Sequence, residues 1–147
     1  MVKSDLMQDN IFGLFYQFKA RMLKALSDTG ASIAPMHVKC LHIINRTSPC
    51  TAQDIALTMG RDKAQVTRLV NDLIGRSLVC KKLNPKDKRS QFISLTASGI
   101  EMVKVMGQVQ KEIMQYMQKD IAPEDLEAFN RVAVLMTENL KNEQWDS

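Results

Sequence analysis

The 147-residue sequence lacks any run of about 18 consecutive apolar residues, the length that a membrane-spanning helix needs. Its amino-terminal residues also lack the apolar stretch of a secretory signal peptide. We therefore expect a cytoplasmic protein without a membrane partner. Internal repeats and low-complexity linkers are missing too, and a chain of this length can bury one good core. The sequence thus predicts one domain over residues 1–147.

Cysteine is scarce, and the three cysteines stand far apart. Cys40, Cys50 and Cys80 form no CxxC pair, and only His37 and His42 could add imidazole ligands. This pattern argues against a structural zinc site and against a disulfide framework. We interpret the cysteines as reduced, buried or half-buried thiols, and a redox- or metal-sensing thiol is the alternative.

Catalytic constellations are missing as well. The sequence has no carboxylate pair, Ser/His/Asp set, phosphate-binding loop or metal cluster at a productive spacing. We therefore expect no enzyme activity, no bound metal and no cofactor.

Basic charge is concentrated in one part of the chain. Residues 61–89 contain nine Lys or Arg against three acids, whereas residues 120–147 contain seven acids against two basic residues. The formal net charge of the whole chain is only +4. Such a local excess of positive charge is typical of a surface that meets a polyanion.

Apolar spacing predicts a mainly helical chain. Apolar residues recur every three or four positions over residues 5–26, from Pro35 to about residue 44, over residues 97–119, and from Pro123 to residue 140. The helix that follows the predicted cap Thr96 is apolar on two sides, so it must be covered on two sides.

Two short capped helices occupy the middle of the chain. Thr51 is placed as an N-cap with Asp54 three residues on, and Gly60 ends this first helix. Asp62 is the next N-cap, with Gln65 at the reciprocal position, and a helix with an apolar stripe follows. Two such helices joined by a short turn with glycine predict a helix-turn-helix.

A charged hairpin comes next in the sequence. Residues 78–83 and 91–95 are short strand-like runs, and the polar segment between them is rich in turn formers. A helix-turn-helix with such a hairpin is a winged helix, whose second helix enters the major groove while the hairpin reaches neighbouring phosphates. We therefore predict a mainly α chain with a small β-hairpin, and a winged helix-turn-helix over about residues 35–96.

The exposed side of the second helix carries side chains that suit base edges. Arg pairs well with guanine, and Gln and Asn pair with adenine, so Gln65 and Arg68 are the first candidates, with Asn71 beside them. The residues expected to contact phosphates are Lys63, Thr67, Lys81 and Lys82. The alternative is an ordinary solvated helix surface, but the adjacent hairpin favours DNA binding.

The hairpin tip adds Lys86, Lys88 and Arg89 to the predicted DNA-binding residues. Arg89 suits the minor groove, where narrow A·T tracts concentrate negative potential. Asp87 cannot attract phosphate, so we expect it to shape the wing by accepting hydrogen bonds from a nearby Arg or from turn amides. The alternative for Asp87 and Arg89 is a surface ion pair of little consequence.

These motifs resemble the MarR (multiple antibiotic resistance regulator) family of transcription factors over nearly the whole chain. The matching runs are Thr51 to Ala56, Val66 to Val70, Leu78-Val79, and Asn84 to Arg89 leading to Ile93 through Gly99. One position departs from the family pattern, which usually has glycine where Ser77 stands. A residue at such a helix end often takes the left-handed conformation, which glycine adopts without steric cost.

The resemblance implies an obligate homodimer in which helices of about residues 5–27 and 97–143 interleave across a two-fold axis. Such a dimer would place two recognition helices roughly 34 Å apart on a pseudo-palindromic operator. The resemblance also implies a ligand-responsive repressor, with a small aromatic effector bound between the dimer region and the DNA-binding lobe. The candidate effector residues are Phe15, Met36, His37, Cys40 and Arg46. The alternative for His37 and Cys40 is ordinary packing.

The function that we expect is therefore sequence-specific binding of double-stranded DNA by a dimeric transcriptional regulator. The alternative is a winged-helix protein-interaction module whose basic surface meets an acidic partner without specific DNA binding. A specific binder should prefer its palindromic duplex over random DNA by about 10³ or more, whereas the module should show no preference.

Overall fold

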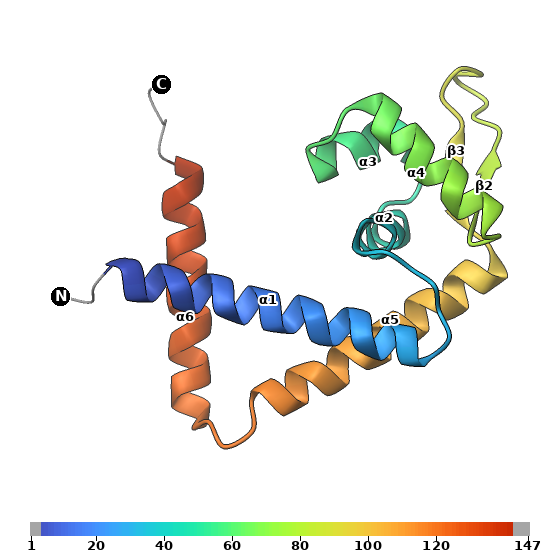
Figure 1. Cartoon of the computed structure of the whole chain (residues 1–147). Coiled ribbons are helices and arrows are strands. Elements are labelled where there is room, and N and C mark those ends of the chain that lie inside the picture. Colours follow the sequence, from blue (N-terminus) through green and yellow to red (C-terminus); the bar gives the residue numbers. More distant parts are fainter. Residues whose placement is uncertain (1–3, 143–147) are drawn as a thin grey trace. The chain divides into compact units, whose positions relative to one another are not determined.

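The computed structural model describes residues 4–142, in which the chain forms two compact units. The first unit ends at Ile113 and holds four helices, a small sheet and most of a fifth helix, while the second unit begins at Met114. The elements, shown in Figure 1, are α1 (Ser4–Asp28), α2 (Pro35–Arg46), β1 (Cys50–Thr51), α3 (Ala52–Met59), α4 (Lys63–Gly75), β2 (Val79–Lys82), β3 (Phe92–Leu95), α5 (Ala97–Met117) and α6 (Pro123–Asn142).

These elements confirm the mainly helical fold with its winged helix-turn-helix. The single-domain organisation over residues 1–147 stays a prediction, and its two ends, like the predicted helix end at residue 143, lie outside the described residues. None of the helices in residues 4–142 is both long and apolar enough to cross a membrane.

The caps of α3 and α4 form largely as the sequence predicts. The Thr51 hydroxyl accepts a hydrogen bond from the Asp54 amide (3.3 Å), and the Asp54 carboxylate accepts one from the Thr51 amide (2.8 Å). Gly60 ends α3 in the left-handed region, with φ at 62°. Asp62 Oδ1 accepts from the Gln65 amide (2.8 Å) and caps α4. The reciprocal bond from the Gln65 side chain, however, is not formed within the described part of the chain.

The end of α4 adopts the conformation for which glycine is favoured. Ser77 has a φ of 58° and donates its amide to the Ile74 carbonyl (2.9 Å), while the Leu78 amide donates to the Leu73 carbonyl (3.0 Å). This pair of bonds is the Schellman motif, which satisfies the last carbonyls of a helix. Both leucines belong to the buried core. The motif is therefore complete although serine occupies its left-handed position.

The sheet has three strands where the sequence predicts two. β2 and β3 pair antiparallel, with Val79 opposite Leu95. The extra strand is β1, which consists of Cys50 and Thr51 and pairs antiparallel with the other edge of β3. A two-residue strand contains no alternation that apolar spacing could reveal. The predicted hairpin is therefore confirmed, and β1 extends it to three strands and joins the start of α3 to the wing.

Helix α5 begins against the end of α4. Thr96 Oγ1 accepts a hydrogen bond from the Gly99 amide (3.0 Å) and donates one to the Ser77 carbonyl (2.6 Å). The Thr96 amide donates to the Leu78 carbonyl (3.1 Å). Gly99 packs against the same carbonyl so tightly that an added Cβ would stand 2.0 Å from the Leu78 oxygen. The wing and α4 are thereby joined to α5.

One hydrophobic core holds the first unit together. Its buried residues come from α1 to α5 and the sheet. The largest fully buried side chains are Leu26, Leu41, Ile55, Leu73, Val66, Val70, Val79, Cys40 and Cys50. α1 contributes only through its end, because Leu26 is buried whereas Phe12 and Phe15 are 52% and 58% exposed.

Two of the three thiols should react slowly with thiol reagents in the folded protein. Cys40 and Cys50 are buried, and burial raises the pKa of Cys40 to about 12 and that of Cys50 to about 11. Because the thiolate is the reactive form, both stay inert near pH 8. Cys80 is partly exposed on β2. Titration with a chromogenic disulfide should count one fast thiol in native protein and all three in denaturant. Three fast thiols in native protein would contradict this burial.

Candidate nucleic-acid interface

The outer side of α4 carries the residues predicted to read bases. Val66, Val70 and Leu73 are buried beneath it. Gln65, Arg68 and Asn71 are exposed, and their side chains form no hydrogen bond or ion pair with residues 4–142. A guanidinium and two amides that have no partner of their own can bond to base edges without breaking an internal contact.

Lys63 and Thr67 lie one turn apart on α4 and differ in their readiness to bind phosphate. The Thr67 hydroxyl donates its proton to the Lys63 carbonyl (2.8 Å). A phosphate oxygen needs a donor, so Thr67 would first have to give up this bond. The Lys63 ammonium is exposed and has no such commitment. Lys63 is therefore the stronger phosphate candidate of the two.

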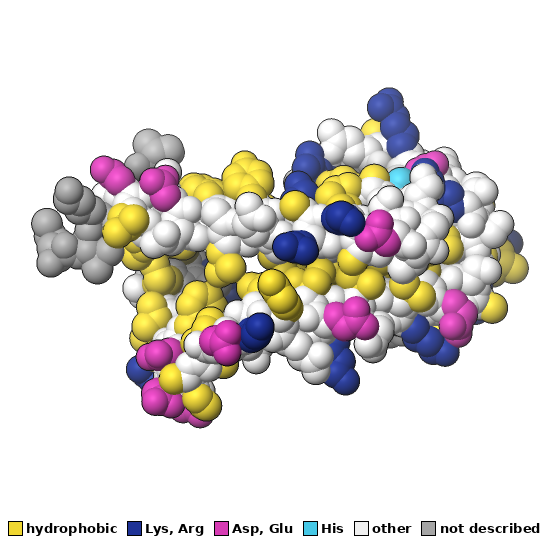
Figure 2. All heavy atoms as spheres, turned by 60° about the horizontal axis from the view of Figure 1, so that its bottom comes forward, with side chains coloured by type: hydrophobic (Ala, Val, Ile, Leu, Met, Phe, Trp, Pro, Cys, Tyr) yellow, Lys and Arg dark blue, Asp and Glu magenta, His cyan; other side chains and the backbone are white. Residues whose placement is uncertain are grey.

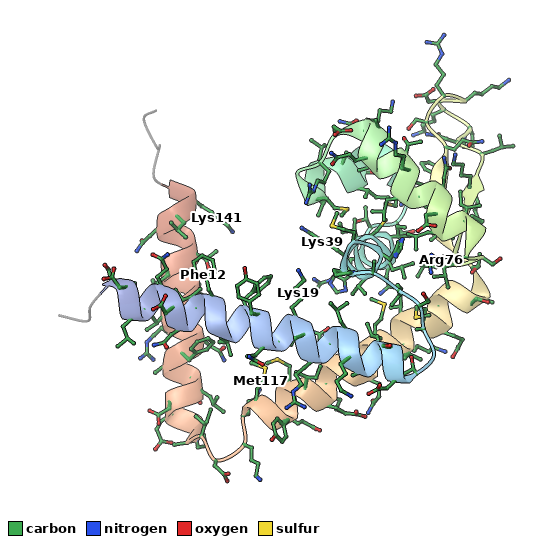
Figure 3. The ribbon with its side chains drawn as sticks, viewed as in Figure 1. Phe12, Lys19, Lys39, Arg76, Met117 and Lys141 are labelled. Carbon is green, nitrogen blue, oxygen red and sulfur yellow. The ribbon has the colours of Figure 1, made fainter. Side chains whose placement is uncertain are left out.

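The wing tip is built from two turns that short polar side chains stabilise. Asn84 Oδ1 accepts a hydrogen bond from the Lys86 amide (3.0 Å), and Asp87 Oδ1 accepts one from the Arg89 amide (2.9 Å). Both are Asx turns, in which a side-chain oxygen bonds the amide two residues on. Long side chains extend from this tip into solvent (Figure 3). Asp87 thus bonds a turn amide, and the Arg89 guanidinium is left exposed.

Lys81 and Lys82 are exposed neighbours on β2, opposite Ile93 and Phe92 of β3. Consecutive residues of a strand point to opposite faces of the sheet. The two side chains therefore start from opposite faces of the sheet. We expect the two single substitutions, Lys81→Ala and Lys82→Ala, to have unequal effects on DNA affinity.

The three acids among residues 61–89 are all committed to structural contacts. Asp62 caps α4, Asp87 shapes the wing, and Asp72 bonds His37 and Arg76. The other cations of this stretch form no ion pair with the rest of residues 4–142. They are Arg61, Lys63, Arg68, Lys81, Lys82, Lys86, Lys88 and Arg89. The surface therefore presents its positive charge without internal neutralisation, as a polyanion partner requires.

Sequence reasoning missed two features of this surface. The first is Arg61, which is exposed and lines the same hollow as Gln65 and Arg68. Its position immediately before the N-cap Asp62 was the sequence signal that could have identified it as a candidate DNA-binding residue. The second feature is the contact between His37 and Asp72, which lie 35 residues apart. No local sequence pattern indicates that pair.

A hollow of about 340 Å³ lies against α4. Its volume is within the range of small-ligand sites. It is lined by Met36, Met59, Arg61, Gln65, Val66, Arg68, Leu69 and Asp72. Met36 is the member of the predicted effector set that lines it. Of the others, Phe15 is exposed on α1, His37 and Cys40 are buried, and Arg46 is exposed with its Nη1 3.3 Å from His42 Nε2.

Comparison with known proteins identifies relatives of this chain. The model of the MarR family matches residues 33–91. The HTH-type transcriptional regulator TcaR of Staphylococcus aureus is 30% identical over 126 residues, which are 83% of this chain and 81% of TcaR. The HTH-type transcriptional regulator PetP of Rhodobacter capsulatus is 25% identical over 100 residues. That match covers 68% of this chain and 60% of PetP.

Solved structures share the fold at lower sequence identity. A complex of S. aureus MepR with DNA matches with a TM-score of 0.77 and 19% identity, over 95% of this chain and 99% of that chain. A mutant MarR from E. coli matches with a TM-score of 0.76 and 17% identity, over 93% and 98% of the two chains. The backbone architecture is therefore common to this chain and to these proteins.

Proposed function

Because the chain belongs to the MarR family of transcriptional regulators, we propose that it is a homodimer that binds a pseudo-palindromic duplex DNA operator sequence-specifically and represses transcription there. In this proposal α4 reads bases through Gln65, Arg68 and Asn71. Lys63, together with residues of the wing, binds phosphates, and Arg89 enters the minor groove.

The observation that carries the proposal is the set of unpaired cations around α4 and the wing. A structural role would be expected to pair these cations with acids, yet the three acids of this stretch are committed to a cap, a wing turn and the His37 contact. Each phosphate contact releases condensed counterions from DNA, which makes the affinity depend steeply on salt. The protein-interaction module is less well supported, because its partner would not need the unpaired Gln65 and Asn71.

Exposed apolar helix surface supports the homodimer. In the first unit, the apolar residues of α1 from Leu6 to Tyr16 are 42% to 64% exposed. In the second unit, Phe129 and Leu140 of α6 are 57% and 63% exposed. Figure 2 shows hydrophobic side chains open to solvent on the face that it displays. Apolar helix stripes of this length need a cover, and a second copy of the chain is the cover that we propose.

Ligand response is part of the proposal, and the hollow beside α4 is where we place it. Four of its lining residues are apolar, and Gln65 and Arg68 are among its polar ones. A small aromatic acid that binds there would occupy the two residues that read bases. Such a ligand would favour the DNA-free state by its difference in affinity between the two states.

The test begins with sequencing of DNA fragments that the purified protein selects from a random pool. The recovered motif should be a pseudo-palindrome, and the protein should prefer it over random duplex by about 10³ at fixed salt. Arg68→Ala should relax preference at one base pair of each half-site by about 5- to 150-fold, and Arg89→Ala should weaken binding mostly through A·T-rich flanks. A reporter under the recovered operator should be repressed in cells.

The outcomes separate the two candidate functions. A preference ratio near one at every salt concentration would remove specific DNA binding and favour the interaction module. A motif without two-fold symmetry would remove the dimeric mode. Repeating the fixed-salt measurement with small aromatic acids tests the ligand response, since a competitor should weaken operator binding and leave the protein folded.

A further inference from the structure

His37 is a buried polar side chain, only 7% exposed, and its two ring nitrogens have different partners. Nδ1 accepts a hydrogen bond from the Ala34 amide (3.0 Å) at the start of α2. A nitrogen that accepts from an amide carries no proton, so the proton of the neutral ring must be on Nε2. Nε2 therefore donates to the Asp72 carboxylate of α4.

Asp72 is also the partner of Arg76, which connects the recognition helix to a third element. Arg76 Nε donates to Asp72 Oδ2 (3.4 Å), and Arg76 Nη1 donates to the Ser32 carbonyl in the connection between α1 and α2. Arg76 lies at the end of α4 near that connection (Figure 3). The hydrogen bond from His37 is the main reason that the pKa of Asp72 lies below its ordinary value.

This cluster bears on base readout because Asp72 follows Arg68 by four residues on the exposed side of α4. Side chains four apart on a helix are neighbours, and Arg and Asp at that spacing readily pair. Yet Arg68 has no ion pair with any of residues 4–142, while Asp72 Oδ2 contacts His37 and Arg76. A carboxylate released from His37 would keep Arg76 as its partner on the following turn and would have Arg68 as a second neighbouring cation, on the preceding turn.

We propose that His37 is a positioning residue for DNA readout, which holds Asp72 toward α2 and thereby keeps the Arg68 guanidinium available to a base. The proposal rests on the proposed function, since it assigns a cause to the availability of a base-reading residue. Its consequence is that a side chain of α2, which faces away from solvent, controls the specificity of α4.

Two matched pairs of variants test the role of His37. The side-chain oxygen of Gln can accept the hydrogen bond from the Ala34 amide, as Gln does at the third position of a capping box, and its nitrogen can donate to Asp72. His37→Gln should therefore keep the base preference within about threefold, whereas His37→Leu should lose about tenfold of it at the Arg68 base pair alone. Asp72→Asn and Asp72→Ala both remove the carboxylate that could pair with Arg68, so both should keep the Arg68 base preference within about threefold, although only Asn keeps an oxygen acceptor for His37.

The measurement is the equilibrium affinity of each purified variant for the selected operator and for its single-base variants, at fixed salt. Thermal unfolding provides the folding control. In an Arg68→Ala background, His37→Leu should change the preference at that base pair no further, because the residue through which it acts is gone. A purely structural role for His37 would instead reduce binding equally at every base pair and in both backgrounds.

Three results would overturn the proposal. They are an unchanged preference at the Arg68 base pair in His37→Leu, an equal loss of that preference in His37→Leu and His37→Gln, and a loss in His37→Leu that adds to the loss in Arg68→Ala. Should His37→Leu fail to fold, the Asp72 pair decides, because neither variant has a carboxylate that could pair with Arg68. Loss of the Arg68 base preference in folded Asp72→Asn or Asp72→Ala would overturn the proposal. If the wild-type protein itself shows no sequence preference, the proposed function fails first. Specific binding by wild type with an unchanged His37→Leu variant removes only the role of His37.

Discussion

Gly99→Ala is expected to lower the free energy of unfolding by about 3 kcal/mol or more. An alanine Cβ would stand 2.0 Å from the Leu78 carbonyl oxygen and 3.0 Å from its carbon. That carbonyl cannot easily turn aside, because it also accepts the hydrogen bond from the Thr96 amide (3.1 Å). The start of α5 would therefore have to move away from the end of α4, which would open the core and displace the wing.

Gly107→Ala is the matched control in the same helix. A Cβ at Gly107 meets nothing within 4 Å. Since glycine in a helix interior costs roughly 0.5–1 kcal/mol relative to alanine, this variant should gain that amount. Urea unfolding followed by circular dichroism at one fixed protein concentration compares the two. Similar midpoints for both variants would show that α5 does not pack against Leu78 as the structure has it.

The parts of the fold that depend on local sequence were predictable. Caps at Thr51 and Asp62 join atoms within three residues of each other, so the side chain and its partner amide can be read together. The left-handed turn at Ser77 was also indicated, because a helix end followed by Leu-Val in this family context usually carries glycine. Such contacts are specified before tertiary structure forms.

The parts that depend on distant contacts were not predictable. β1 exists because Cys50 and Thr51 meet β3 some forty residues later, and two residues are too few to show a strand period. The requirement for glycine at Gly99 likewise comes from a carbonyl in another element. Only the folded backbone reveals these close approaches.

The same distinction between local and distant contacts applies to the candidate site. The commitment of Asp62 and Asp87 to nearby amides is local, so the excess of free cations around α4 and the wing could be inferred from charge counting. The availability of the Arg68 guanidinium could not be inferred in this way. It depends on which side chain Asp72 contacts, and that side chain is His37 in another helix. The candidate effector residues could not be grouped either, since their exposure depends on how α1 and α2 pack.

Phe129→Glu on α6 is expected to weaken the proposed homodimer at least about 100-fold. Phe129 is 57% exposed and falls on one helical stripe with Ala133, Met136 and Leu140. Covering such a side chain contributes roughly 1.5–3 kcal/mol, and a two-fold interface contains the position twice. The total loss is therefore about 3 kcal/mol or more, and each 1.4 kcal/mol is a factor of about ten in Kd. Operator affinity should fall with dimerisation.

Val134→Glu is the control for Phe129→Glu, because Val134 is 56% exposed on the same helix and receives the same new side chain. At about 100° per residue, Val134 lies about 140° around the helix from Phe129, off the stripe. Sedimentation over a dilution series should find Val134→Glu dimeric where Phe129→Glu is monomeric. Both variants add one negative charge to the same exposed helix. A difference between their dimer dissociation constants therefore reports the position on the stripe and not the added charge or the helix propensity of Glu. A Phe129→Glu protein that remains dimeric at nanomolar concentration would exclude this stripe from the interface and leave α1 as the surface that a second copy must cover.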